Sequence, residues 1–330
     1  MNELTAKKIT EFINRYDNFL IASHQQPDSD AIYSTLTLAS LLERKGKNYF
    51  CYNEGPFTPS TIKEQQPLFI STPQEIPTRD FALIIVDCNE IQRVGNIAQI
   101  DWIKEIPTLI IDHHIVEQNK SKENLIVFID SNSPSTTLLI KEIADVLELP
   151  LTSKEANQLL FGFSTDSGFF RYINPNQHNY LHTVAKLIES GGNLKECYNK
   201  ITGGKTLEQK KFFSLLINRV TLYYNDSIAI TYENCDDFSY FSPEAKDADL
   251  LYSQLFSINS IEAIFYLKQK EENCYVIGFR SRDKINVGKM ATHFGGGGHR
   301  LASGATVNAT KDSIVQKILT LLKENNFYSD

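Results

Sequence analysis

The stretch PTLIIDHH (residues 107–114) decides the fold, because a short apolar run in it ends directly on an acidic residue and two histidines. The same arrangement recurs in NFLIASH (18–24), FALIIVDC (81–88) and LIVFID (125–130). Continuous apolar runs of this length are typical of strands covered on both faces, as in a parallel sheet. We therefore expect four buried strands, each followed by a polar residue.

Helical patterns alternate with these runs. Residues 30–45 carry apolar side chains at helical spacing, and Gly46 is expected at the end of that helix. A second helix is expected to open at Ser133, as N-cap, with Pro134 in the first helical position. Further helices are expected over 155–164 and 177–190. Alternating strands and helices predict an α/β domain with a doubly wound, mostly parallel sheet.

The chain has 330 residues, which favours two domains. Beyond an amphipathic segment at 207–220 the pattern changes to alternating strands and a glycine-rich stretch. We predict a first domain over residues 1–205, a helical linker over 206–226 and a smaller α/β domain over 227–330.

Composition excludes several classes of protein. Apolar residues make up 42% of the chain and charged residues 22%, as in folded proteins rather than disordered ones. The net charge of −7 argues against binding of long duplex nucleic acid through its phosphates. No apolar run has the roughly 20 residues of a membrane helix, and the polar N-terminus does not resemble a signal peptide. We expect a cytoplasmic protein with no membrane partner.

The strand-end residues are expected to meet, because ligands of open α/β sheets bind beyond the carboxyl ends of the strands. Asp28, Asp30 and Asp166, the last expected in a turn after a helix, are placed to reach the same edge. The resulting set comprises His24, Asp28, Asp30, Asp87, His113, His114 and Asp166. So many carboxylates need a countercharge, which divalent cations supply, and mixed imidazole and carboxylate ligands suit Mn²⁺ while admitting Zn²⁺, Co²⁺ or Fe²⁺. Two ions sharing one carboxylate would favour phosphoryl hydrolysis.

A single Asp at a strand end is more often a helix cap, and a single His is more often a packed residue. The joint occurrence at several strand ends favours function.

These residues also resemble a known family. SHQQPDSDA (23–31), VDC (86–88), DHH (112–114) and STDSGFF (164–170) are similar to the four motifs of the DHH phosphoesterase superfamily. INVGKMATHFGGGGHRLASGAT (285–306) is similar to the signature of the DHH-associated domain. The layout resembles the group of oligoribonucleases that also act as pAp phosphatases, which implies release of 5′-mononucleotides from short RNA.

The resemblance implies a role for each residue. One metal would be bound by His24, Asp28 and Asp87, and the second by Asp30, Asp87, His113 and Asp166. His114 would face the scissile phosphate, and Asp112 would orient the imidazoles. The resemblance points to two Mn²⁺ ions, with Mg²⁺ or Co²⁺ as alternatives.

The glycine-rich segment is the second candidate site. Gly295 to Gly298 precede His299, and consecutive glycines let backbone N–H groups converge on an anion, although a turn is an equal reading. Arg280 and Arg282 would share one face of a strand and bind a phosphate. With the resemblance, we expect Arg280, Gly297, Gly298, His299 and Arg282 to bind substrate.

Three further residues with suggestive positions stay outside the predicted site. Arg171 follows the last acidic residue closely, and an ordinary surface role is equally consistent with its position. His178 and His182 have the spacing of a metal pair on a helix, but no carboxylate completes it, so we interpret them as surface residues.

Three alternatives remain open. The partners are expected to be short RNA oligonucleotides or small nucleotides such as pAp, pApA and cyclic di-AMP. The first alternative is a phosphodiesterase that acts mainly on pApA or cyclic di-AMP, which would need the same metal ligands and the same nucleotide pocket. An inorganic pyrophosphatase would not need the glycine-rich segment. A non-catalytic nucleotide-binding regulator would be expected to lack some of the seven residues. The sequence does not decide whether the chain forms a homodimer.

Overall fold

The structure is a computed structural model that describes residues 1–76, 80–114, 124–242, 246 and 248–324. The chain divides into two compact units, Met1–Gly204 and Lys205–Asp330, which are described in turn.

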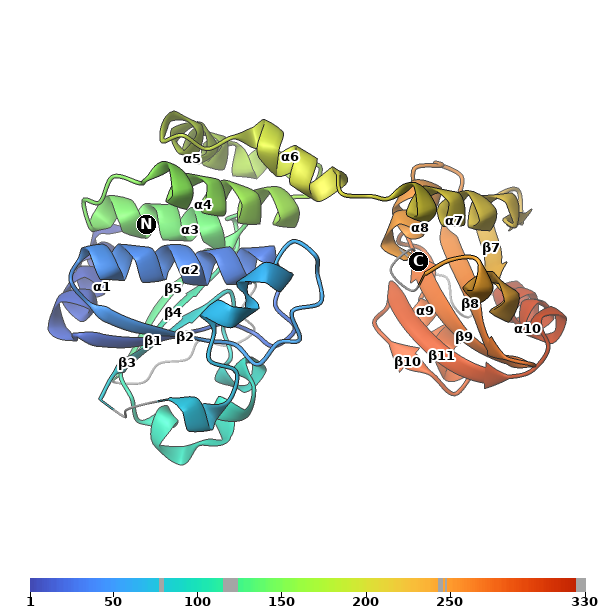
Figure 1. Cartoon of the computed structure of the whole chain (residues 1–330), viewed down its shortest axis with the longest axis horizontal. Helices are drawn as coiled ribbons and strands as arrows, with labels where there is room; N and C mark the ends of the chain where they lie inside the picture. The colour runs from blue at the N-terminus through green and yellow to red at the C-terminus, as the bar shows by residue number, and fades with distance from the viewer. Residues whose placement is uncertain (77–79, 115–123, 243–245, 247, 325–330) are drawn as a thin grey trace. The chain divides into compact units, whose positions relative to one another are not determined.

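A five-stranded parallel sheet forms the centre of the first unit (Figure 1). Its strand order is β2-β1-β3-β4-β5, and every neighbouring pair is parallel. The strands are β1 (Asn18–Ala22), β2 (Asn48–Tyr52), β3 (Ala82–Val86), β4 (Thr108–Asp112) and β5 (Leu125–Ile129). The chain changes direction across the sheet between β1 and β3, which is where ligands bind in folds of this kind. The prediction of an α/β domain on a parallel sheet is confirmed.

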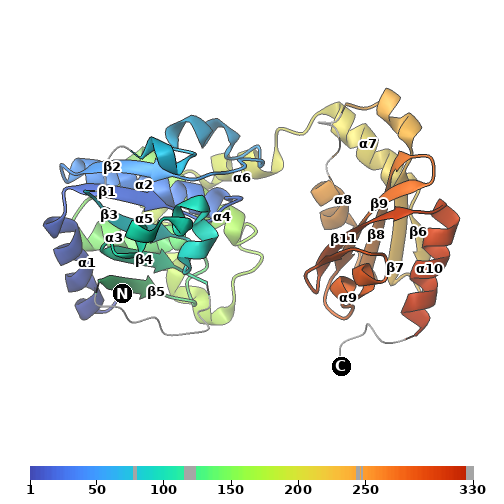
Figure 2. The same cartoon turned by 90° about the horizontal axis from the view of Figure 1, so that it is seen from below.

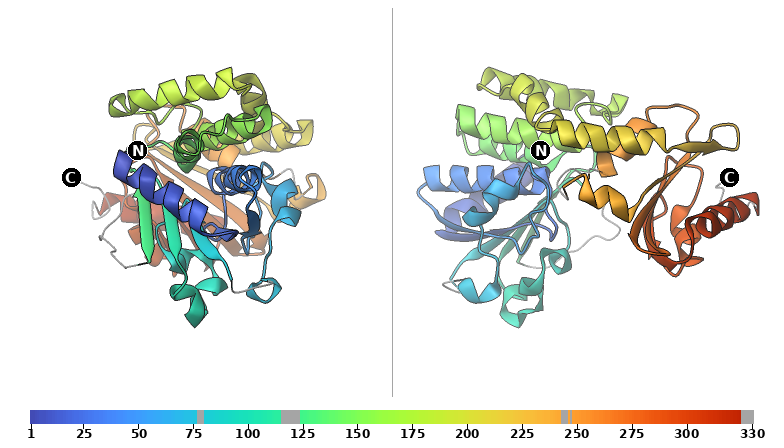
Figure 3. Two further views of the ribbon diagram at one scale, coloured as in Figure 1. Left: turned by 90° about the vertical axis from the view of Figure 1, so that its left-hand side faces the viewer. Right: turned by 45° about the vertical axis from the view of Figure 1, so that its right-hand side comes forward.

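Helices cover one face of this sheet in successive layers (Figures 1 and 3). Helices α1 (Glu3–Arg15), α2 (Ser29–Arg44) and α3 (Thr136–Val146) share a buried core with residues such as Ile21, Ile84 and Ile111. Helix α4 (Ser153–Asp166) packs on α2 and α3, and α5 (His178–Glu189) and α6 (Leu194–Thr202) pack on α4. A side chain at the sheet edge that comes from α2 or α4 is therefore also held by packing between helices.

Short 3₁₀ helices cover the opposite face. They are η2 (Pro73–Glu75), η3 (Ile91–Val94), η4 (Asn96–Gln99) and η5 (Asp101–Lys104), whereas η1 (Lys63–Leu68) is flanked by Ile62 and Phe69, which pack in the core on the helix side. Val94, Ile97 and Ile103 from η3, η4 and η5 form one cluster with Leu83 and Ile85 of β3. Both faces of β3 are thus buried, as its unbroken apolar run predicts.

The start of α3 differs from the prediction. The helix begins at Thr136 with Ser135 as N-cap, whose side chain accepts a hydrogen bond from the Leu138 N–H, so Ser133 is not the cap. The backbone N–H groups of Thr136 and Thr137 donate to the carboxylate of Asp30 at 2.6 and 3.0 Å. These free N–H groups at the helix end are satisfied by a residue of α2, which sets where the helix starts.

The second unit is a mixed six-stranded sheet with helices on both faces (Figure 2). Its order is β10-β11-β9-β8-β7-β6, with β7 and β8 parallel and the other pairs antiparallel. The strands are β6 (Thr221–Tyr223), β7 (Ile228–Glu233), β8 (Ala263–Glu271), β9 (Cys274–Ser281), β10 (Gly297–Gly298) and β11 (Ala302–Asn308). Helices α7 (Leu207–Asn218) and α8 (Ala248–Leu255) pack on one face, and α9 (Val287–Thr292) and α10 (Lys311–Lys323) on the other.

Helix α7 lies within residues 206–226, the segment expected as a linker. It buries Phe212 and Leu216 against β7, β8 and α8 of the second unit. Two further 3₁₀ helices, η6 (Pro175–Gln177) and η7 (Cys235–Ser239), connect elements within the first and second units respectively. Among the residues that the structure describes, none of the helices combines the length and apolar composition needed to cross a bilayer.

An ion pair between a buried carboxylate and a partly exposed arginine joins α2 to α4. The Glu155 carboxylate, 1% exposed, accepts hydrogen bonds from Arg44 Nη1 at 2.8 Å and from Ser40 Oγ at 2.7 Å, both on α2. It also caps its own helix through the backbone N–H of Thr152 at 2.7 Å. Burial opposes its charge, but these hydrogen bonds prevail and lower the pKa of Glu155. The contact fixes the two helices that carry Asp30 and Asp166.

We expect Glu155→Gln to reduce the free energy of unfolding at neutral pH by about 1.5–3 kcal/mol, because hydrogen bonds to a charged acceptor are lost. A carboxyl whose folded pKa is lowered stabilises the protein above its unfolded pKa of about 4.3 and ceases to do so as pH falls through the folded value. Urea unfolding of both proteins from about pH 7 to about pH 3 should therefore show a difference that disappears in acid. A pH-independent difference would contradict this account.

Candidate metal centre

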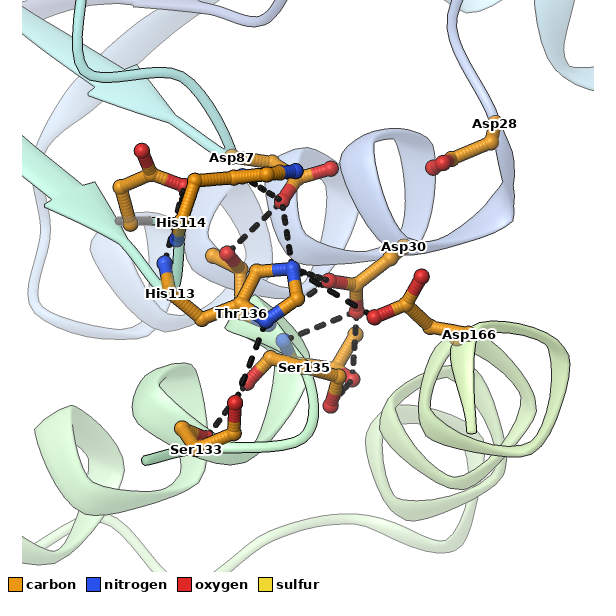
Figure 4. Close-up of polar contacts among 12 residues, drawn as sticks. Asp28, Asp30, Asp87, His113, His114, Ser133, Ser135, Thr136 and Asp166 are labelled. Carbon is orange, nitrogen blue, oxygen red and sulfur yellow. Dashed lines mark hydrogen bonds and ion pairs between the residues drawn. The ribbon is translucent and has the colours of Figure 1, made fainter. Parts of the chain in front are cut away.

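Seven polar residues converge at the carboxyl edge of the parallel sheet, and Figure 4 labels all of them except His24. His24 follows β1, Asp87 follows β3, and His113 and His114 follow β4. Asp28 is the N-cap of α2 and Asp30 lies in its first turn, while α4 extends further than predicted, so that Asp166 is its last residue rather than part of a turn. The edge therefore collects side chains from five separate elements.

The donor atoms of these residues form three groups in which all atoms lie within 4.8 Å of one another. The groups are His24, Asp28 and Asp87; Asp30, His113 and Asp166; and Asp87, His113 and His114. Ligand atoms around one divalent ion have separations in this range, given metal–ligand distances of about 2.0–2.2 Å. Asp87 and His113 each occur in two groups, so the groups are contiguous.

His24 and His113 each form a hydrogen bond from one ring nitrogen to a backbone carbonyl. His24 Nδ1 lies 2.9 Å from the Gln25 carbonyl oxygen, and His113 Nδ1 lies 3.2 Å from that of Ser133. A carbonyl accepts only, so each Nδ1 carries a hydrogen, and Nε2 is the ring nitrogen that remains to face the carboxylates. These Nε2 atoms lie 3.4 Å from Asp87 Oδ2 and 3.4 Å from Asp166 Oδ2 respectively. Both rings are thus oriented as metal ligands.

Asp87 is the most constrained residue of the site. Its side chain is 1% exposed, and its φ of 56° is in the left-handed region that few residues other than glycine, Asn and Asp adopt. Burial alone would raise the pKa of Asp87, but the hydrogen bond from His24 and the charges of His113, His24 and His114 lower it. Thr136 Oγ1 donates to Asp87 Oδ1 at 2.9 Å and helps to fix the carboxylate.

The carboxylates of the site lie close enough to repel one another. Burial and the neighbouring carboxylates of Asp87, Asp166 and Asp28 raise the pKa of Asp30 well above its usual value, and burial raises that of Asp166 to about 6. Asp30 nevertheless accepts hydrogen bonds from Thr136 N, Thr137 N and Thr137 Oγ1, which organise it as an anion. Divalent cations would relieve this repulsion, and the mixed imidazole and carboxylate donors suit such ions.

His114 and Asp112 form a pair beside these groups. His114 Nδ1 lies 2.7 Å from Asp112 Oδ1, which also accepts from the backbone N–H of His113 at 2.8 Å. This hydrogen bond raises the pKa of His114 to about 9. The His114 side chain is 43% exposed, whereas Asp112 is fully buried. The pair holds a protonated imidazole at the rim of the site.

The residues that support the carboxylates were missed by sequence reasoning. Thr136 and Thr137 looked like ordinary residues of a helix start, and only the contact with Asp30 gives them a role. Gly162 lies in the interior of α4, where glycine is unfavourable, and this anomaly was the available signal. A Cβ atom there would lie 2.5 Å from Thr137 Cγ2 and 3.1 Å from Asp30 Oδ1.

The predicted substrate-binding residues lie in the second unit. Gly297 and Gly298 form β10, which pairs with Gly304 and Ser303 of β11, and His299 is exposed at the turn. Arg280 is on β9, and its guanidinium stacks 4.6 Å from the centre of the Tyr252 ring.

Arg282 lies beyond the end of β9, so the two arginines do not share a strand face as expected. Its side chain donates to the carbonyls of Phe256, Ile258 and Ile261 at 2.6, 3.0 and 3.0 Å.

Arg171, His178 and His182 are all exposed. Arg171 stacks on Tyr172, with 4.6 Å between its guanidinium carbon and the ring centre. None of the three belongs to the candidate metal-binding groups found among the described residues.

Two families match the chain. Residues 18–163 match the family described as DHH family, N-terminal domain, and residues 229–325 match the DHHA1 domain.

Curated relatives match most of the chain. A bifunctional oligoribonuclease and PAP phosphatase of Thermus thermophilus is 26% identical over 92% of this chain and 89% of its own length. The protein of the same name from Bacillus subtilis is 26% identical over 95% of this chain and 97% of its own. A cyclic-di-AMP phosphodiesterase of Bacillus subtilis is 25% identical over 90% of this chain, but only 46% of that protein is covered.

A solved structure shares the fold. The crystal structure of an exopolyphosphatase-related protein from Bacteroides fragilis superposes with a TM-score of 0.79 at 21% identity, covering 98% of this chain and 96% of that one.

We expect Gly162→Ala to reduce the free energy of unfolding by about 1–3 kcal/mol, because the new methyl group must displace Thr137 and Asp30. An exposed helical glycine would instead gain up to about 1 kcal/mol from the same change. Denaturant unfolding measures the difference, and Lys154→Ala, at an exposed position of the same helix, serves as the control. A stabilised Gly162→Ala protein would show that Asp30 has room to move.

Proposed function

The chain is a phosphoesterase built from a DHH family N-terminal domain and a DHHA1 domain, and we propose that it hydrolyses short oligoribonucleotides to 5′-mononucleotides. We extend the proposal to pAp, which would yield AMP. The observation that carries it is the set of contiguous donor groups at the sheet edge, with the buried carboxylate of Asp87 common to two of them. The names of the relatives that span nearly the whole chain support the choice of substrate.

We propose Mn²⁺ as the cofactor, since imidazole and carboxylate together suit this ion. His24, Asp28 and Asp87 would hold one ion, and Asp30, Asp87, His113 and Asp166 the other. Two such ions supply an activated water and neutralise charge on the phosphate.

The chain's own residues prepare the site for this chemistry. The Gln25 and Ser133 carbonyls hold the His24 and His113 rings through Nδ1, so that Nε2 of each ring is turned toward the carboxylates of the site. His114, protonated and held by Asp112, is placed at the rim to donate a hydrogen bond to the phosphate or a proton to the leaving oxygen. Metal binding by His24 and His113, and donation by His114, depend on side chains that are already oriented before the substrate binds.

In the second unit we propose that Arg280, Gly297, Gly298 and His299 bind the nucleotide. The stack on Tyr252 holds the Arg280 guanidinium in one orientation, which reduces the entropy lost when it binds a phosphate. The three carbonyl contacts of Arg282 indicate instead that it holds the loop over residues 256–261.

A phosphodiesterase of cyclic di-AMP or pApA is the second candidate, because one relative named for the first activity matches 90% of this chain. We propose to separate the two by incubating metal-stripped protein and Mn²⁺ with pAp, pApA, cyclic di-AMP, RNA of two to five nucleotides and pyrophosphate. Fastest turnover of the short RNA supports the first proposal, and fastest turnover of cyclic di-AMP supports the second. Turnover of none would favour a binding protein.

We expect Asp87→Asn to reduce kcat for RNA dinucleotides on the order of a thousandfold, about 4 kcal/mol, because both metal groups lose a shared anion. The amide retains the side-chain shape and accepts from Thr136, and Asn tolerates the left-handed backbone, so the fold should survive. Initial rates with Mn²⁺, together with circular dichroism, make the comparison. Near-normal turnover would refute a role for Asp87 in both groups.

We expect Arg280→Ala to raise KM for the dinucleotide roughly ten- to a hundredfold with little change in kcat, since a charged hydrogen bond to phosphate contributes about 1.5–3 kcal/mol. Arg282→Ala is the matched comparison. It should lower the thermal stability and leave KM nearly unchanged. If KM rose only in the Arg282 variant, Arg282 would be the phosphate-binding residue and Arg280 a structural one.

A further inference from the structure

The loop that carries His24 is held by the buried side chain of Asn53, which follows β2. Asn53 is fully buried, and its Nδ2 donates to the His24 carbonyl oxygen and to Ser23 Oγ, both at 2.9 Å. Its Oδ1 accepts from the Gly55 N–H at 2.8 Å. One amide therefore makes three hydrogen bonds that join the ends of β1 and β2.

The next residue, Glu54, holds the same loop from its exposed side. Its carboxylate accepts from Gln25 Nε2 at 2.8 Å, from Asn96 N at 2.6 Å and from the Tyr52 hydroxyl. Gly95 leaves the space for this carboxylate, since a Cβ atom there would lie 2.6 Å from it. Glu54 thus ties β2, the His24 loop and η4 together.

Main-chain contacts complete the support. Gln25 N donates to the Arg93 carbonyl at 2.8 Å, and Gln26 N donates to that of Gly55 at 3.0 Å. Gln26 has a φ of 54°, a conformation that persists when the surroundings fix it from several sides. Residues 24 to 26 are each anchored by a different neighbour, so the position of the His24 ring does not depend on its own contacts alone.

The residues that belong to the second metal group alone are held from α3 and the turn before it, and Thr136 of α3 also donates to the shared Asp87. Asp30 is held by Thr136 and Thr137, and His113 by the Ser133 carbonyl. None of the contacts described for Asn53 and Glu54 involves Asp30, His113 or Asp166. A change at Asn53 should therefore affect the group that contains His24 more than the other, with which it shares only Asp87.

We infer that Asn53 and Glu54 are positioning residues for the metal ion bound by His24, Asp28 and Asp87, and that they act on the affinity of this ion more than on that of the other. The inference rests on the proposed two-metal function. Partners that orient a metal ligand typically contribute ten- to a hundredfold in affinity, a range that a binding titration resolves.

The test is a Mn²⁺ titration of the full-length protein without substrate, with free Mn²⁺ measured by electron paramagnetic resonance. Wild type should bind two ions, and Asn53→Ala should bind one with nearly unchanged affinity and the other roughly ten- to a hundredfold more weakly. Asn48→Ala is the matched control, because Asn48 lies at the opposite end of β2 and its side chain contacts Asn18. It should bind as wild type does.

Glu54→Gln provides a variant that is expected to fold even if Asn53→Ala does not, since its side chain is partly exposed and keeps its shape. It should weaken the same ion, to a smaller extent. Folded variants that bind both ions as tightly as wild type would overturn the inference, as would equal weakening of both ions. A wild-type protein that binds no Mn²⁺ would instead contradict the proposed function.

Discussion

Electrostatic repulsion among four carboxylates at one sheet edge is the constraint on which the first unit depends. Asp30 and Asp87 are each 1% exposed, and water therefore does little to screen them. The protein compensates with backbone N–H groups at the start of α3 and with threonine hydroxyls. These contacts organise the carboxylates without supplying a full countercharge, which leaves the site suited to cations.

Much of this edge could be predicted because the rule linking apolar runs to strand ends is local. His24, Asp87 and His113 each follow an unbroken apolar segment, and parallel pairing then brings the segments' ends together. The predicted start of α3 was wrong because it depends on a contact that is distant in the sequence. Ser133 and Ser135 are both good caps, and the choice between them is made by Asp30, which is more than a hundred residues away.

The second unit shows a similar limit. Alternation predicted that Arg280 and Arg282 point the same way, yet β9 ends at Ser281 and the Arg282 side chain turns to the carbonyls of residues 256–261. Gly162 and Asn53 belong to the same class of residue. Their roles come from neighbours in space, Asp30 in one case and the His24 carbonyl in the other, which a single sequence does not reveal.

The left-handed backbone of Asp87 restricts the evolution of this position. Glutamate would keep the charge but add a methylene group and occupy an unfavourable conformation, whereas asparagine would keep the conformation and lose the charge. The easiest change for the fold is thus also the one that removes the chemistry. A gene lineage that replaced Asp87 by asparagine would retain an intact scaffold and both of its domains, and would be free to diverge into a protein that binds a phosphoester without cleaving it.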